Sequence, residues 1–252
     1  MNTDVAVIGA GYVGLPIALR FAQNQVRVSI VDIDDSKVQS LRGGKSYINE
    51  IPSEQIAQAV QEKFLWPTSD FDGIKSAGTI IVCVPTPLTK NREPDMHFVL
   101  GTAEKIGKLL QPSQLVSLES TTYPGTTTGP FRETLEKHSG LIAGKDFHLA
   151  FSPEREDPGN PESRVDRVPK IVGGLTEVCQ EKAVALYSKI AGSVIPVGSC
   201  EVAEAAKLLE NIFRSVNIAL VNELKVIYDK MGIDIWQVIE AAKTKPFGFM
   251  PF

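Results

Sequence analysis

Three glycines near the amino terminus constrain the fold of this chain more than any other feature. They form the pattern Gly-x-Gly-x-x-Gly at residues 9–14, between the apolar run 5–8 and a stretch with helical periodicity. In a strand-to-helix turn of this kind, Gly9 permits the tight bend, Gly11 leaves room for a pyrophosphate, and Gly14 lets the helix pack closely on the strand. Free N–H groups at the helix start favour a phosphate there. The pattern therefore predicts a dinucleotide-binding turn.

A second apolar run, residues 26–31, ends on Asp32, about 20 residues after the glycines. An acid at this position can bind both ribose hydroxyls of the adenosine half of a dinucleotide. Its charge would repel a 2′-phosphate, so Asp32 favours NAD over NADP. The alternative is that Asp32 only caps the helix that follows.

Composition limits the class of protein. The 252 residues suffice for one large α/β domain, or for one domain and part of another. The hydrophobic share of 43%, the charged share of 22% and the formal net charge of −4 are ordinary for a globular protein. No apolar stretch reaches the roughly 18 residues that span a bilayer, and neither a signal region nor a basic run is present. We therefore expect a cytoplasmic protein that binds neither nucleic acid nor membranes.

The three cysteines are expected to be structural thiols. Cys83, Cys179 and Cys200 are odd in number and lack Cys-x-x-Cys spacing. This arrangement indicates neither a disulfide framework nor a zinc site, so no metal is predicted.

Apolar runs alternate with helical patterns along the first 198 residues. After the first two strands, further strands are expected at residues 64–67, 78–84, 115–119, 147–151, 168–174 and 193–197. This alternation predicts two βαβ halves that share one mostly parallel, doubly wound, Rossmann-like sheet of six to eight strands. Because it contains a proline, the strand at 64–67 is expected at or near the sheet edge.

Three polar loops follow predicted strands, at residues 85–88, 120–127 and 152–161. Open α/β sheets bind ligands outside the carboxyl ends of their strands, which is where these loops lie. The alternative for the first loop is that its prolines only mark a turn. The third loop carries acids and an arginine between prolines, and such stiff loops on a scaffold often carry function, although a solvated charged face is the alternative.

The pattern becomes purely helical from Cys200 to about Met231. Such a helix would be roughly 45 Å long, and apolar residues cover more than half of it, so we expect a dimer surface or a bridge to a second domain. Lys207 and Asn211 fall on one face, with Arg214 a turn further. A snorkelling lysine beside a capped asparagine is the structural alternative.

A further helix with a possible capping box is expected from Asp234 to about residue 243, and the apolar tail after it suggests truncation.

Five blocks resemble, in order, the NAD-dependent nucleotide-sugar 6-dehydrogenases, the UDP-glucose and UDP-N-acetylhexosamine dehydrogenase family. They are residues 9–16, 82–87, 120–125, 152–154 and 206–214. The resemblance covers essentially the whole chain. It implies an NAD-binding Rossmann domain at 1–198, then a connecting helix and the beginning of a central helical dimerisation domain at 199–252. The carboxy-terminal UDP-binding domain of the family would be absent.

The resemblance also implies a reaction. In this family, a primary alcohol at the sugar 6-position is oxidised twice to a carboxylate, through a cysteine-bound thiohemiacetal and thioester, while two NAD are reduced. The cysteine belongs to a Gly-Gly-x-Cys-x-Pro-x-Asp segment that would follow residue 252, so this chain is expected to bind NAD without completing turnover. The segment 243–250 resembles the N-acetylhexosamine branch more than the glucose branch. A role in polysaccharide precursor synthesis and a homodimer through the long helix are expected.

Site residues are carried over from the matching motifs. Cofactor contacts are implied for Gly9, Gly11, Tyr12, Val13, Gly14, Asp32, Lys37, Val84, Pro85, Thr86, Ser120 and Thr121. Catalytic roles are implied for Thr121, Glu154, Glu156, Lys207 and Asn211, and sugar-nucleotide contacts for Glu154, Arg155, Lys207, Asn211 and Arg214. Glu154 matches an acid that activates a base or water. Glu156 matches a second acid, although this loop is shorter than the family's common form. An ammonium and an amide on one rigid helix face suit a developing oxyanion, the role implied for Lys207 and Asn211.

Two other readings remain open. A one-step β-hydroxyacid or 3-hydroxyacyl dehydrogenase also joins a Rossmann domain to long helices, but the Ser-Pro-Glu and Pro-Thr-Pro loops argue against it. A non-catalytic NAD-sensing module would lack the nucleophile, as this chain does.

Overall fold

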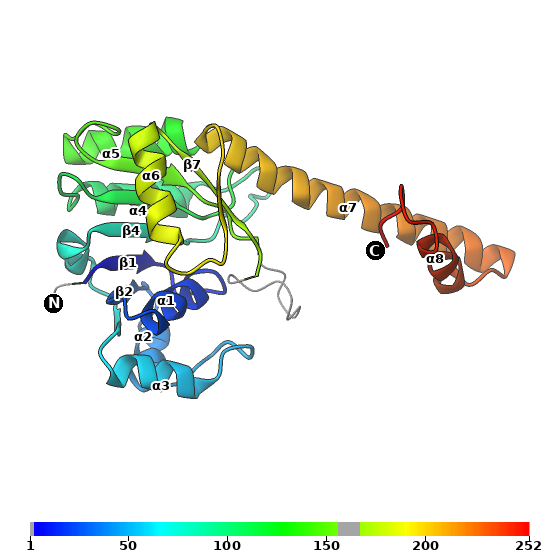
Figure 1. The fold of residues 1–252 in the computed structure, drawn as a ribbon, viewed down its shortest axis with the longest axis horizontal. Coiled ribbons are helices and arrows are strands. Elements are labelled where there is room, and N and C mark those ends of the chain that lie inside the picture. Colours follow the sequence, from blue (N-terminus) through cyan, green and yellow to red (C-terminus); the bar gives the residue numbers. More distant parts are fainter. Residues whose placement is uncertain (1–2, 156–166, 252) are drawn as a thin grey trace. The chain divides into compact units, whose positions relative to one another are not determined.

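The computed structural model describes residues 3–155 and 167–251. Their core is an eight-stranded sheet in the order β3-β2-β1-β4-β5-β6-β7-β8 (Figure 1). The strands are β1 Val5–Ile8, β2 Val28–Val31, β3 Leu65–Thr68, β4 Thr79–Val82, β5 Leu115–Leu118, β6 His148–Phe151, β7 Lys170–Gly174 and β8 Val194–Pro196. All neighbouring pairs are parallel except β6 and β7. The predicted mostly parallel Rossmann-like sheet is confirmed.

The central strands are buried on both faces because helices cover both. Every residue of β1, β2 and β5 is buried, as expected for strands of a covered parallel sheet. Prolines occur in β3 and β8, the two edge strands, where a missing ladder donor is tolerated. The predicted edge position of the strand around Pro67 is therefore confirmed.

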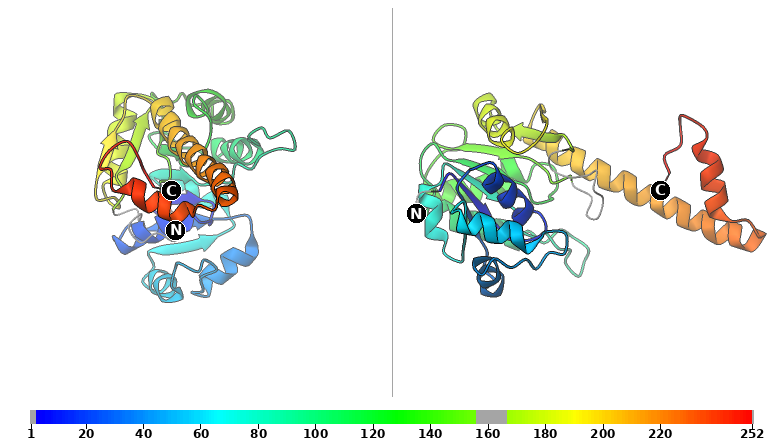
Figure 2. Two further views of the ribbon diagram at one scale, coloured as in Figure 1. Left: turned by 90° about the vertical axis from the view of Figure 1, so that its right-hand side faces the viewer. Right: turned by 60° about the horizontal axis from the view of Figure 1, so that its bottom comes forward.

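Six helices belong to this sheet: α1 Gly14–Gln23, α2 Asp35–Arg42, α3 Ser53–Gln61, α4 His97–Gly107, α5 Arg132–Ser139 and α6 Glu177–Tyr187. Figures 1 and 2 show them on the two sides of the sheet. α1 and α6 share one side, where Arg20 Nε donates to the carbonyl of Ile190. A short 3-10 helix, η1 Phe71–Ser76, and a π-helical segment, η2 Thr127–Phe131, were not predicted from the sequence.

The chain divides into two compact units, residues 1–205 and 206–252. The helix α7, Cys200–Met231, begins in the first and continues into the second, and its extent agrees with the sequence-based expectation. The helix α8, Ile235–Lys243, follows it, with the Asp234 carboxylate accepting from the N–H of Trp236. In a capping box, the Gln237 side chain would accept from the backbone N–H of Asp234. In the structure, Gln237 Nε2 instead donates to the Asp234 carboxylate, so the possible capping box is replaced by this side-chain contact.

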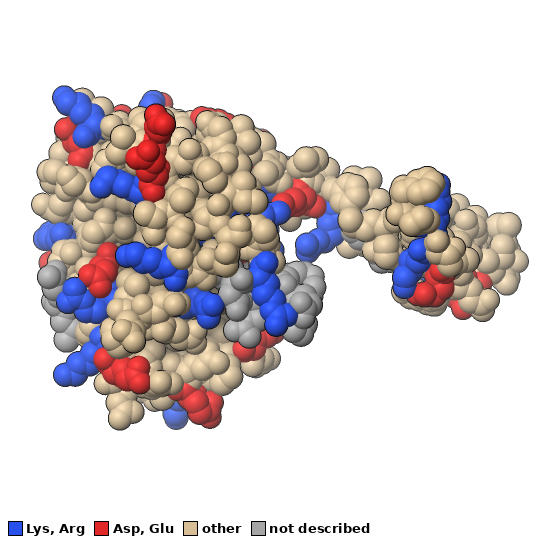
Figure 3. Space-filling view, viewed as in Figure 1, with Lys and Arg blue, Asp and Glu red and all other residues tan. Residues whose placement is uncertain are grey.

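Several large apolar side chains of α7 are exposed, including Leu209, Val216 and Leu220. In the described part of the chain, no helix is long and apolar enough to cross a membrane. Charges of both signs are interspersed over the described residues of the first unit that face the viewer in Figure 3, without a broad area of one sign.

Candidate cofactor-binding site

The turn between β1 and α1 excludes side chains at two of its glycines. Gly9 has φ +100°, and a Cβ there would collide with the backbone carbonyl of Cys83 after β4. A Cβ on Gly14 would collide with the Gly9 carbonyl and lie 3.2 Å from the side chain of Val7. A Cβ on Gly11, by contrast, would meet nothing within 4 Å. The turn is therefore tight against the sheet and open outward at Gly11, which fits a pyrophosphate close to the backbone.

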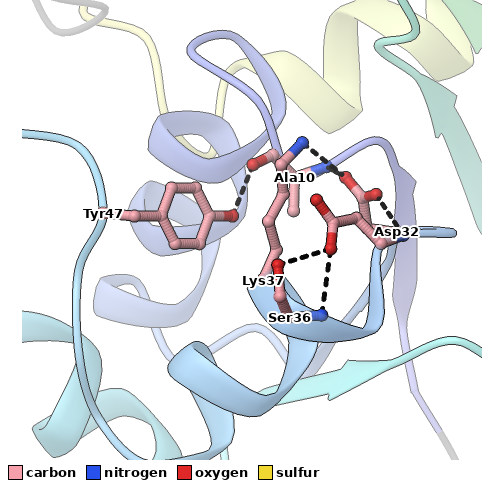
Figure 4. Close-up of polar contacts among 6 residues, drawn as sticks. Ala10, Asp32, Ser36, Lys37 and Tyr47 are labelled. Atoms are coloured by element: carbon pink, nitrogen blue, oxygen red, sulfur yellow. Dashed lines mark hydrogen bonds and ion pairs between the residues drawn. The ribbon is translucent and has the colours of Figure 1, made fainter.

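Asp32, at the end of β2, faces this turn (Figure 4). Its Oδ2 accepts from the N–H of Ala10 at 2.7 Å, and its Oδ1 accepts from the N–H of Asp34 at 2.9 Å. Lys37 Nζ, from α2, lies 3.6 Å from Oδ2. The helix cap of α2 is Asp34, whose side chain accepts from the N–H of Ser36. The alternative that Asp32 only caps this helix is therefore wrong.

Tyr47 is a member of this network that sequence reasoning missed. Its hydroxyl donates to the carbonyl of Ala10 over 2.5 Å, from the loop between α2 and α3 (Figure 4). The two residues are 37 positions apart, and no local pattern marks a tyrosine in an irregular loop as a partner of a distant turn.

The loops after β4 and β5 are joined by two hydrogen bonds. The N–H of Val84 donates to Ser120 Oγ at 3.0 Å, and Thr86 Oγ1 donates to the carbonyl of Thr121 at 2.7 Å. Pro85, between Val84 and Thr86 in the loop after β4, is exposed. The structure thus brings together the residues expected near the nicotinamide, beside the glycine turn that packs on Cys83.

The loop after β6 is fastened to the start of β7. Ser152 Oγ donates to the carbonyl of Ile171 at 2.9 Å, and Arg155 Nη1 donates to that of Pro169 at 2.7 Å. Glu154 is half-buried between these anchors. Glu156, the expected second acid, lies outside the described residues.

A buried ion pair lies beneath this loop. Lys170 Nζ is 2.8 Å from Glu119 Oε2 and 3.5 Å from the carbonyl of Pro153. Burial alone would lower the pKa of Lys170, but the carboxylates of Glu119 and Glu154 outweigh it and the pKa is raised. Sequence reasoning missed this pair; the one available signal was an acid at the end of an otherwise apolar strand.

Lys207, Asn211 and Arg214 lie on α7, in the second unit. Lys207 and Asn211 are half-buried one turn apart, and Arg214 is exposed. Tyr12, at the glycine turn, is 66% exposed. Val13 directly precedes α1.

The three cysteines are free and buried. Burial raises the pKa of Cys83 and of Cys200, which disfavours the reactive thiolate. Among the described residues, no group of three or more His, Cys, Asp or Glu side chains could hold a metal ion.

The sheet order, the glycine turn and the acid at the end of β2 define a Rossmann-type dinucleotide-binding protein. The chain belongs to the UDP-glucose/GDP-mannose dehydrogenase family. The NAD-binding domain of that family matches residues 3–191, and its central domain matches residues 201–252. NAD is therefore the cofactor of the sheet domain.

Relatives and solved structures agree with this assignment. The whole chain is 40% identical to the protein CapL of Staphylococcus aureus and 39% identical to UDP-N-acetyl-D-glucosamine 6-dehydrogenase of Pseudomonas aeruginosa, and it covers 58% of each. The UDP-D-ManNAc dehydrogenase of Pyrococcus horikoshii matches with a TM-score of 0.91 at 32% identity, over 97% of this chain and 58% of that one. GDP-mannose dehydrogenase of Pseudomonas aeruginosa, in a ternary complex, matches with a TM-score of 0.88 at 25% identity, over 96% and 57%. The chain thus spans little more than half the length of these relatives.

Proposed function

We propose that this chain is the NAD-binding portion of a UDP-sugar 6-dehydrogenase and that the sugar nucleotide is a UDP-N-acetylhexosamine. The observation that carries the proposal is the hydrogen-bonded junction of the loops after β4 and β5, next to the glycine turn. Two relatives, a UDP-N-acetyl-D-glucosamine 6-dehydrogenase at 39% identity and a UDP-N-acetyl-D-mannosamine dehydrogenase at 34% identity, support the sugar class. The product would be an acidic UDP-sugar, suited to polysaccharide synthesis.

Bound NAD supplies the hydride acceptor, and the residues of this chain supply placement. Gly9, Gly11 and Gly14 would leave the backbone open to the pyrophosphate, with Tyr12 and Val13 beside them. Asp32 would accept from the adenosine ribose, with Lys37 Nζ 3.6 Å from its Oδ2. Val84, Pro85, Thr86, Ser120 and Thr121 would border the nicotinamide. Thr121, whose carbonyl accepts from Thr86 Oγ1, would also lie near the reacting carbon.

The remaining roles concern protons and charge. Glu154 would take or relay the alcohol proton, with Glu156 assisting and Arg155 contacting the substrate. Lys207 would stabilise the oxyanion and Asn211 would orient water. Arg214 would face the nucleotide sugar. The division of the chain into an NAD-binding domain at 1–198 and a helical region at 199–252 belongs to the same proposal, as does a nucleophilic cysteine outside these residues.

Calorimetric titration of the 252-residue chain tests the cofactor half of this proposal. We expect NAD to bind, NADP to bind far less, and UDP-N-acetylglucosamine to bind weakly or not at all. Absence of NAD binding by a folded chain would show that the glycine turn is only architectural.

The gene product that contains this chain tests the reaction. NADH formation with UDP-N-acetylglucosamine, UDP-N-acetylmannosamine and UDP-glucose in parallel would rank the sugars. Lys207→Met is expected to lower kcat strongly, with NAD affinity unchanged. NADH formation with a small hydroxyacid and none with any UDP-sugar would overturn the assignment.

We also infer a homodimer through α7. Leu209 and Val216 are seven residues apart on the helix and 67% and 61% exposed, which suits a helix-to-helix seam. Light scattering should find a dimer for the chain and a monomer for Leu209→Lys/Val216→Lys. Ser215→Lys, on a neighbouring face, should remain dimeric. A monomeric unmodified chain at high concentration would contradict the inference.

A further inference from the structure

Both peptide groups that adjoin Ala10 are held by side chains from outside the glycine turn. The Gly9–Ala10 peptide donates its N–H to Asp32 Oδ2 at 2.7 Å. The Ala10–Gly11 peptide accepts at its carbonyl from the hydroxyl of Tyr47 at 2.5 Å. Figure 4 shows the two side chains reaching the same short segment from different elements. The conformation of the turn is therefore imposed from two directions.

The second of these bonds fixes the direction of one particular donor. In a trans peptide, the carbonyl and the N–H of the next residue lie in one plane and point in opposite directions. A hydroxyl that holds the Ala10 carbonyl thus turns the Gly11 N–H away from Tyr47. A Cβ built on Gly11 meets no atom within 4 Å, so there is open space beside this residue.

Tyr47 is itself well fixed. Its side chain is partly buried and packs against the hydrophobic core, as does that of Ile51 in the same loop. In the same loop, the N–H of Ser46 donates to Ser53 Oγ at 3.0 Å, and Ser46 Oγ donates to the carbonyl of Ile48 at 2.9 Å. Burial, with the charge of Asp32, raises the pKa of the Tyr47 phenol, so the group remains a donor throughout the physiological range.

We propose that Tyr47 is a positioning residue of the NAD site, whose hydroxyl sets the Ala10–Gly11 peptide so that the Gly11 N–H faces the pyrophosphate. The role rests on NAD binding by this domain and does not depend on the sugar or on the oxidation. A tyrosine outside the glycine motif thereby completes the turn that the motif begins. Removing the hydroxyl leaves the ring and its packing in place.

Titration of Tyr47→Phe with NAD, ADP and adenosine tests this proposal. Loss of one hydrogen bond that orients a phosphate donor should weaken NAD and ADP by roughly fivefold to tenfold and leave adenosine unchanged. Tyr228→Phe makes the same chemical change on α7 and should alter none of the three affinities. Equal affinity of Tyr47→Phe and the unmodified chain for NAD would overturn the proposal, as would equal weakening of adenosine.

An amide NMR spectrum gives a second readout that needs no ligand. The Gly11 N–H shares a peptide with the carbonyl that Tyr47 holds, so its signal should shift in Tyr47→Phe, while signals of the distant strand β8 stay in place. The same spectrum shows whether the variant is folded. An unmoved Gly11 signal would exclude an effect of the Tyr47 hydrogen bond on the Ala10–Gly11 peptide. Failure of the unmodified chain to bind NAD would instead count against the cofactor assignment, and the two results are separable.

Discussion

Lys170, the first residue of β7, forms a buried ion pair with Glu119, the residue directly after β5, at 2.8 Å. The two strands are not neighbours, because β6 lies between them. They meet because β7 runs antiparallel to β6, which brings the beginning of β7 to the edge where β5 and β6 end. Lys170 Nζ also lies 4.8 Å from the ring centroid of Tyr187. The reversed direction of β7, which β8 shares, thus supplies a cation under the polar loops.

Lys170→Met should destabilise the first unit strongly, because the Glu119 carboxylate would remain buried without its partner. Breaking a buried pair on one side costs about 3–5 kcal/mol. The double change Glu119→Leu/Lys170→Met removes both charges and should be closer to the unmodified protein. Urea unfolding measures both, with Lys75→Met in the exposed Asp72 pair as the control. A Lys170→Met that is no less stable than this control would contradict the expectation.

Glu204→Gln should loosen the segment before α5. The Glu204 carboxylate is fully buried and accepts from the N–H of Gly125 at 2.7 Å and from the N–H and hydroxyl of Thr127 at 2.9 and 2.6 Å. Glutamine replaces one acceptor oxygen by a donor that would face another donor. A buried unsatisfied group of this kind costs about 1–3 kcal/mol.

Hydrogen exchange locates this loss. The amides of Gly125 and Thr127 should exchange faster in Glu204→Gln, ahead of the sheet amides. Glu201→Gln is the matched control, because its amide oxygen can still accept from Thr128 Oγ1. Unchanged exchange at both amides would show that the two N–H groups find other acceptors.

Periodicity predicted most of this fold because it is a local property. The apolar runs at 5–8 and 115–119 became buried parallel strands, and the long pattern from Cys200 became α7 at its expected bounds. The direction of β7 was not predictable in this way. An apolar run looks the same whether it pairs parallel or antiparallel, and the choice depends on the connection to β6.

The site residues likewise fall into those that a local pattern predicts and those that depend on contacts between distant parts of the chain. The glycine turn and Asp32 have fixed spacings, so their meeting could be expected, and the structure joins them through Ala10. Tyr47 and Lys170 act through contacts with residues 37 and 51 positions away. No spacing rule links such pairs, because loop conformation and sheet order decide them. Sequence reasoning therefore found the residues that motifs carry and missed those that hold the motifs in place.

His148 should make the stability of the chain depend on pH. Burial lowers the pKa of His148 below the usual imidazole value of about 6.5, and the positive charge of Lys182 lowers it further. The unfolded chain therefore takes up this proton at a higher pH than the folded one, so stability is lost as pH falls from about 6.5 through the folded pKa. His148→Gln should reduce this slope in urea unfolding measured over about pH 5 to 7.5. His97→Gln removes an imidazole at an exposed position and serves as the control; an equal slope in His148→Gln and the unmodified chain would assign the dependence to other groups.

Asp32 and Lys37 together should decide between NAD and NADP. Asp32 opposes a 2′-phosphate by its charge, whereas Lys37, 3.6 Å from it, would attract one. Asp32→Asn should therefore lower the preference for NAD by roughly tenfold, partly through tighter NADP binding. Asp32→Asn/Lys37→Met should lose the gain for NADP while keeping the weaker NAD binding, because the lysine is then no longer present to meet the phosphate. Calorimetry with both cofactors separates the two effects. If NADP binds equally to both variants, Lys37 does not reach the ribose, and its role is confined to the ion pair with Asp32.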